Sequence, residues 1–151
     1  MSDLISAEAK TWIGRAAPPQ RVEINRSDII KYSVATQQRA HEHLTGNIAP
    51  PMFLFAAMRP IVPIDQLGPD GIARDSFLPD LPLKRVMAGG TKMQFHRAVM
   101  PNDVLIAIRT LSGISEKQGS SGPLIFLTYE LKIKTEGGEL VMEEEQTRIL
   151  R

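Results

Sequence analysis

The chain has 151 residues, enough for one domain with a substantial core. Its hydrophobic fraction of 42% and charged fraction of 23% are ordinary for a soluble globular protein. The formal charge is +1 and neither sign forms a long block, which disfavours a nucleic-acid-binding function. With no cysteine in the sequence, a disulfide framework and a thiolate zinc site are both excluded.

The sequence also lacks the marks of a membrane or secreted protein. No apolar run approaches the ~20 residues of a membrane-spanning helix. The first six residues carry Asp3 where a signal peptide would be basic, and no long apolar segment follows. We therefore expect a soluble, cytoplasmic protein with no membrane partner.

Helices are expected mainly in the first half of the chain. A short helix is predicted over residues 3–13, ended by Gly14. A brief strand over residues 21–24 follows, and Ser27 then caps a second helix. Residues 1–20 are interpreted as an N-terminal helical extension of a single domain.

The most informative stretch covers residues 46–58. Pro50 and Pro51 stand directly before seven uncharged residues, and proline is tolerated in the first turn of a helix. A helix that is apolar on every side is expected to be buried. Its N-terminus would present free N–H groups and a partial positive charge, which suit a carbonyl oxygen or an anion.

The remainder of the chain is predicted to be a long connection followed by strands. Residues 63–82 carry four prolines and two glycines and form an irregular connection of a length that is often functional. Alternating patterns then predict strands over residues 84–97 (bent at Gly89-Gly90), from Val104 and over 127–134, and a last strand over 140–150 follows a hairpin turn. An apolar helix and an antiparallel sheet together indicate an α+β domain.

These features resemble the hot-dog fold, and within it the MaoC-like dehydratases, especially their FAS1-like dehydratase branch (an N-terminal domain or a separate subunit). The resemblance covers residues 21–151. Its landmarks are Val22-Glu23, Tyr32-Ser33-Val34-Ala35, Gly46-x-x-Ala49-Pro50-Pro51-x-Phe53, Gly89-Gly90, Phe95-x-Arg97, Asp103-Val104-Leu105, Glu116-Lys117-x-Gly119 and Gly138-Glu139-Leu140-Val141.

The resemblance implies a five- or six-stranded antiparallel sheet wrapped around one buried central helix and paired with a second hot dog. The implied substrate is an acyl thioester of coenzyme A or of a carrier protein, and the implied reaction is reversible hydration of a trans-2-enoyl thioester without a further cofactor. The pairing would give a homodimer or higher oligomer, or a heterodimer with a catalytic MaoC-like subunit.

Hydration needs a general base for water and a donor for the charge that grows on the thioester oxygen. Active relatives carry Asp-x-x-x-x-His before the central helix, and the resemblance places Gln38 at the aspartate position and His43 at the histidine position. Gln38 cannot take a proton at neutral pH, so it could only orient a water or the substrate. His43 is the first candidate base, and His41 or Glu42 stays open because the connection to the helix is shorter than in the family.

The start of the central helix is the predicted substrate-binding segment. The residues are Ala49, Pro50, Pro51, Met52 and Phe53. Active relatives have His-Gly where this chain has two prolines, which have no N–H, so Met52 or Phe53 would have to supply the oxyanion donor. Arg97 is the candidate for contact with a coenzyme A phosphate. The three histidines show no metal-ligand spacing.

Three functions follow as alternatives, and the fold alone does not separate them. The first is a hydratase or dehydratase that is active as a homo-oligomer through His43 or its neighbours. The second is a non-catalytic substrate-binding subunit that shapes the acyl tunnel for a MaoC-like partner; the missing aspartate and the two prolines favour it. The third is a thioesterase that uses a carboxylate or a bound water near the helix N-terminus.

Overall fold

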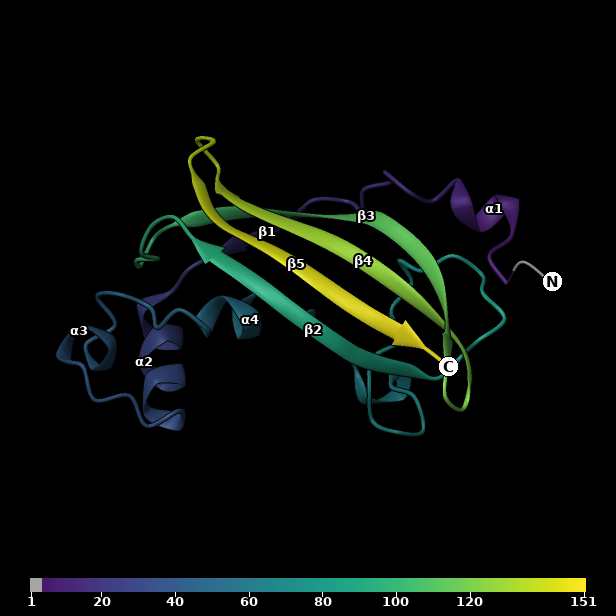
Figure 1. Ribbon diagram of the computed structural model, residues 1–151. Coiled ribbons are helices and arrows are strands. Elements are labelled where there is room, and N and C mark those ends of the chain that lie inside the picture. The colour runs from purple at the N-terminus through teal and green to yellow at the C-terminus, as the bar shows by residue number, and fades with distance from the viewer. Residues whose placement is uncertain (1–3) are drawn as a thin grey trace.

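The computed structural model describes residues 4–151 (Figure 1). Its helices are α1 (Ala7–Lys10), α2 (Arg26–Ala35), α3 (His41–Leu44), α4 (Phe53–Ala57) and the 3₁₀ turn η1 (Ile64–Gln66). Its strands are β1 (Gln20–Glu23), β2 (Val86–Phe95), β3 (Val104–Gly119), β4 (Gly122–Thr135) and β5 (Leu140–Leu150). None of these helices has the length and apolar character needed to cross a membrane.

The strands form one antiparallel sheet in the order β1-β3-β4-β5-β2. This sheet confirms the predicted α+β, hot-dog class. The bend expected at Gly89-Gly90 is a β-bulge, because the register with β5 shifts between Ala88 and Gly90. A Cβ at Gly89 would lie 2.9 Å from the Thr147 Cγ2 atom, so glycine allows the bulged strand to approach its neighbour.

The first two helices differ from expectation at their boundaries. The expected 3–13 helix is a single turn, α1, capped by the Ser6 hydroxyl, which accepts a hydrogen bond from the Ala9 N–H at 3.0 Å. The expected start at residue 3 lies outside the described residues. Helix α2 begins at Arg26 with Asn25 at its N-cap, so the prediction that Ser27 caps this helix is wrong.

Helix α4 contains the apolar run that suggested a fully buried helix, but it has only five residues. Phe53 and Leu54 are buried, whereas Met52 and Phe55 are each 45% exposed. The expectation of burial on every side is therefore wrong. The helix packs one face on the core, and its other face borders an open cavity that the segment after Ala57 only partly covers.

Two separate hydrophobic cores lie along the inner face of the sheet. The first packs α2 and α4 against the sheet through Ile29, Phe53 and Leu105. The second packs α1 and the end of the long connection through Ala9, Leu81 and Leu111. Figure 1 shows α1 at the opposite end of the sheet from α2 and α3. The inner face between the two cores carries both apolar and polar side chains.

Candidate functional site

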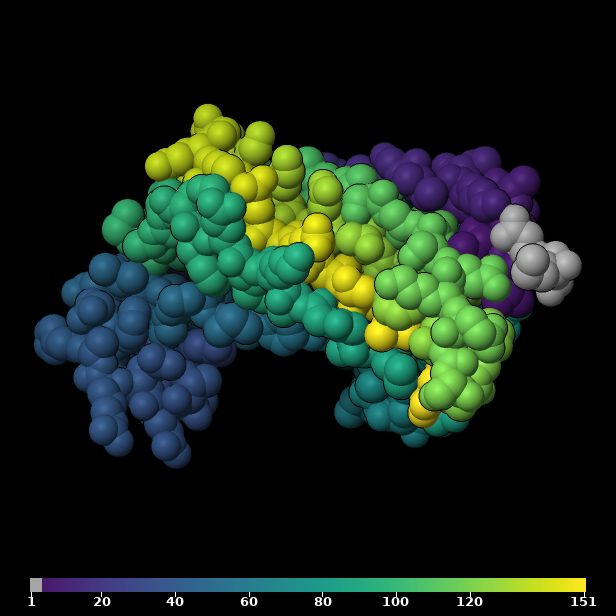
Figure 2. All heavy atoms as spheres, in the orientation of Figure 1, coloured from purple at the N-terminus to yellow at the C-terminus, as the bar shows by residue number. Residues whose placement is uncertain are grey.

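A cavity of about 550 Å³ lies between the two cores. Its floor is the inner face of β3, β4 and β5, and its walls come from α4 and from the connection over residues 58–77. Figure 2 shows the molecule hollowed between the lobe of α2 and α3 and the long connection. This volume is within the range of sites for small molecules and cofactors.

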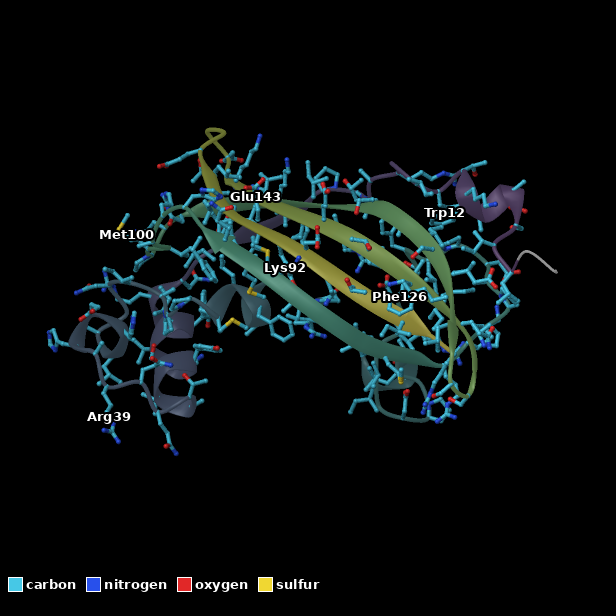
Figure 3. All side chains as sticks on the ribbon, in the orientation of Figure 1. Trp12, Arg39, Lys92, Met100, Phe126 and Glu143 are labelled. Carbon is cyan, nitrogen blue, oxygen red and sulfur yellow. The ribbon has the colours of Figure 1, made fainter. Side chains whose placement is uncertain are left out.

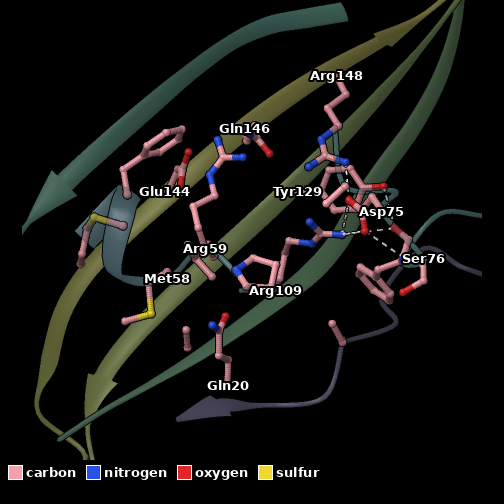
Figure 4. A pocket seen from close by; sticks show the side chains of 18 of the residues that line it. Gln20, Met58, Arg59, Asp75, Ser76, Arg109, Tyr129, Glu144, Gln146 and Arg148 are labelled. Carbon is pink, nitrogen blue, oxygen red and sulfur yellow. Dashed lines mark hydrogen bonds and ion pairs between the residues drawn. The ribbon is translucent and has the colours of Figure 1, made fainter. Parts of the chain in front are cut away.

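One end of the cavity, next to α4, is mainly apolar, although Glu144 lies there between Met93 and Leu131 on the neighbouring strands (Figure 4). We call it the apolar end; its residues are Met52, Phe55, Met58, Met93, Leu131 and Met142. Four of these six are methionines, whose unbranched side chains adapt to ligands of irregular shape. This wall can therefore enclose a flexible hydrocarbon chain.

The other end of the cavity carries charge, and we call it the basic end. It is formed by Arg109 on β3, Tyr129 on β4, Arg148 on β5 and Asp75 on the long connection (Figure 4). Arg109 Nη2 donates to Asp75 Oδ1 and Oδ2 at 2.8 and 2.7 Å, and Arg148 Nη1 donates to Asp75 Oδ2. Two guanidinium groups thus share one carboxylate.

The surroundings of Asp75 keep it ionised. Burial raises the pKa of this carboxyl, but hydrogen bonding and charge from Arg109, the Phe77 N–H and charge from Arg148 outweigh burial and lower it below its usual value. The Phe77 N–H donates to Asp75 Oδ1 at 2.9 Å. The carboxylate is therefore a fixed negative charge that holds this part of the connection against the sheet.

Tyr129 lies beneath the two guanidinium groups and forms the floor of the basic end. Its hydroxyl donates to the Phe77 carbonyl oxygen at 2.9 Å, and burial raises the pKa of this phenol. The Arg109 and Arg148 guanidinium carbons lie 4.6 and 5.2 Å from the centre of its ring. Cation–π contacts of this kind orient the two guanidinium planes over the ring.

The candidate catalytic residues lie elsewhere, on the lobe of α2 and α3. Neither His41, His43 nor Gln38 lines the cavity. His41 is exposed, and the Gln38 amide donates to the Thr36 hydroxyl at 3.2 Å. His43 is partly buried, and its Nδ1 atom lies 2.8 Å from the Ile48 carbonyl oxygen.

The predicted substrate-binding segment divides between cavity and core. Pro51 and Met52 line the cavity. Ala49 and Phe53 belong to the first core, and Pro50 is also buried. The Phe53 N–H donates to the Pro50 carbonyl oxygen at 2.9 Å, so it is already used within the chain.

Arg97 also stands apart from the cavity. Its guanidinium donates to both carboxylate oxygens of Asp103, at 2.7 and 3.0 Å, and to Glu139 at 3.1 Å. These hydrogen bonds, together with charge, raise the pKa of Arg97. Its contact with a coenzyme A phosphate stays a prediction.

Sequence reasoning missed the basic end, although part of the signal was there. Arg109 follows the same two-residue alternation as Leu105 and Ala107, whose side chains are buried. A charged residue in phase with a buried set faces the core, so it indicates either a buried ion pair or a site. Asp75 lies in an irregular segment, where no periodicity could have marked it.

Comparison with known proteins agrees with this architecture. The family model described as the FAS1-like, dehydratase domain region matches residues 11–144. A mesaconyl-C(4)-CoA hydratase from Chloroflexus aurantiacus is 28% identical over 147 residues, which are 97% of this chain and 52% of the relative. The chain thus spans about half the length of this curated relative.

Solved structures show the same fold. The ChsH1-ChsH2 complex from Mycobacterium tuberculosis contains a chain with a TM-score of 0.69 at 18% identity, covering 99% of this chain and 96% of that one. The C-terminally truncated HadBC (3R-hydroxyacyl-ACP dehydratase) complex from the same organism gives a TM-score of 0.63 at 15% identity, covering 91% and 96%. Since the family model matches most of the chain, the protein belongs to the FAS1-like dehydratase domain family.

Proposed function

We propose that this chain is the acyl-binding part of a hydratase or dehydratase for enoyl thioesters, and that a partner hot-dog subunit supplies the catalytic base. One observation carries the proposal: the cavity has the size and the apolar wall for an acyl group, yet none of the candidate bases lines it. The name of the curated relative supports an acyl-CoA hydration reaction.

The start of α4 offers few donors for the charge on a thioester oxygen. Pro50 and Pro51 have no N–H, and the Phe53 N–H is bonded to a carbonyl oxygen. This arrangement favours a partner that brings both the oxyanion donor and the Asp/His pair. In this chain the two positions of that pair are occupied by Gln38 and His43.

The sheet offers a place for such a partner. β2 has ten residues and forms one of the two edges of the described sheet, with β5 as its neighbour. An edge strand of this length is a ready template for pairing with another sheet. Two of the similar structures are described as complexes, ChsH1-ChsH2 and HadBC, which supports a heteromeric assembly here.

The test compares two samples. One is the chain alone, and the other is the chain co-expressed with a hot-dog protein that has an intact Asp-x-x-x-x-His motif and is encoded by a neighbouring gene. We expect crotonyl-CoA and trans-2-octenoyl-CoA to bind the chain alone in calorimetry without loss of enoyl absorbance. Turnover should need the co-expressed pair. Rapid hydration by the chain alone would overturn the subunit assignment, and release of free coenzyme A would indicate the thioesterase.

The second candidate function is a hydratase that needs no partner subunit. It is favoured by the hydrogen bond between His43 and the Ile48 carbonyl oxygen. A carbonyl oxygen only accepts, so Nδ1 carries the proton toward Ile48 and leaves Nε2 free to act as a base. If the chain alone turns over, His43→Ala should reduce the rate at least about 100-fold. His41→Ala, on the same short helix but exposed, tests the alternative base: loss of the rate in this variant and not in His43→Ala would assign the role to His41.

A further inference from the structure

The cavity carries more positive than negative charge. Four arginines line it (Arg59, Arg74, Arg109 and Arg148), against two carboxylates, Asp75 and Glu144. Glu144 accepts a hydrogen bond from the Thr91 hydroxyl at 2.7 Å, and Asp75 accepts from two guanidinium groups and a backbone N–H. An unbranched hydrocarbon chain needs none of this charge, so an all-apolar acyl group does not account for the cavity.

The guanidinium groups of the basic end keep donors available. Arg109 uses only its Nη2 atom and Arg148 only its Nη1 atom in hydrogen bonds to acceptors among the described residues. Each guanidinium has five N–H donors in a fixed fork. Both side chains are 24% exposed, so the unused donors can meet a ligand. A planar anionic oxygen pair, such as a carboxylate, matches that fork.

The two ends of the cavity are arranged for a ligand with a polar end. Figure 4 shows Met58, at the end of α4, on the opposite side of the cavity from Asp75 and Arg148. A chain running along the apolar end would therefore bring its far end to the guanidinium groups.

We propose that the basic end binds a carboxylate at the far end of the acyl group, so that the substrate is the thioester of a dicarboxylic acid. This inference rests on the proposed function, because it assumes that the cavity receives an acyl group. Anionic oxygens also occur in the phosphates of coenzyme A, and the experiment must distinguish these two sources.

The experiment measures dissociation constants of the full chain for glutaryl-CoA, pentanoyl-CoA and free coenzyme A. The two thioesters share the coenzyme and the chain length and differ in a terminal carboxylate against a methyl group. Since charge-assisted hydrogen bonds are strong, we expect glutaryl-CoA to bind about tenfold more tightly than pentanoyl-CoA. Equal affinities would overturn the inference, whereas failure of both thioesters to bind would instead refute the proposed function.

Substitutions then test which residues cause the preference for glutaryl-CoA over pentanoyl-CoA. Arg148→Gln should reduce the preference to about twofold or less, while Asp75→Asn, which removes the competing carboxylate, should increase it. A merely structural cluster would lose stability in both variants without moving the preference in opposite directions. Arg148→Lys, which keeps the charge but not the fork, should retain part of the preference and serves if Arg148→Gln does not fold.

The control variant is Arg39→Gln, which removes an exposed arginine at the tip of the helical lobe, far from the sheet (Figure 3). It should leave the affinities for all three ligands unchanged. If Arg148→Gln weakens free coenzyme A and both thioesters by the same factor, the arginine contacts a phosphate and the carboxylate assignment is wrong.

Discussion

At the scale of single residues, Arg97 and Asp103 fix the turn that leads into β3. Besides the two hydrogen bonds from Arg97, Asp103 Oδ2 accepts from the Met100 N–H at 2.8 Å. Hydrogen bonding from Arg97 lowers the pKa of Asp103, and burial opposes it only in part. The carboxylate is therefore more stable in the folded chain than in the unfolded one.

We expect Asp103→Asn to lower the free energy of unfolding by about 1–3 kcal/mol at pH 7. Because the folded pKa is lowered, this stabilisation is present above the unfolded pKa of about 4 and is lost as pH falls through the folded value. Urea unfolding at pH 7 and pH 3 measures both effects, and the difference between wild type and variant should shrink at the lower pH. Asp80→Asn is the control, since its pair with Lys84 is exposed; an equal loss in that variant would contradict the argument.

At the scale of elements, Gly46 controls how α3 lies against α2. Its φ is +71°, and a Cβ there would lie 2.7 Å from Arg26 Cγ, 2.8 Å from the Arg26 carbonyl oxygen and 2.9 Å from Ile30 Cγ1. We expect Gly46→Ala to destabilise the protein by about 2–4 kcal/mol, through backbone strain and the clash with α2. Thermal unfolding measures this, and Gly137→Ala should be nearly neutral, because a Cβ there would make only an ordinary contact of 3.8 Å with Thr135 Oγ1 and φ lies outside the left-handed region. An unchanged midpoint for Gly46→Ala would show that α3 can move away from α2.

The elements also show which parts of the structure a sequence can predict. The strands could be predicted because the first residues of β3 and most of β4 alternate with a two-residue period, and because the hairpin turn before Leu140 marks the start of β5, which has the expected bounds. The length and the burial of α4 could not be predicted, because a run of seven apolar residues does not show which elements pack against it. The basic end depends on Asp75 meeting strands far away in the sequence, and no local pattern encodes that contact.

At the scale of the whole molecule, the sheet has two edges of very different length. β1 has four residues and pairs with β3, whereas β2 has ten residues and pairs with β5. A short edge is a poor template for pairing, and a long one a good template. The proposed partner subunit should therefore add to β2 and extend the sheet from that side.

Hydrogen exchange can test this arrangement directly. In the chain alone, β4 is flanked by β3 and β5 and should exchange slowest, whereas the outward amides of β2 should exchange rapidly. In the co-expressed pair we expect the β2 amides to slow at least about tenfold, because the partner strand satisfies them, while β1 keeps its rate. Protection that appears at β1, or on the helical lobe and not at β2, would place the partner on another surface and refute the extended sheet.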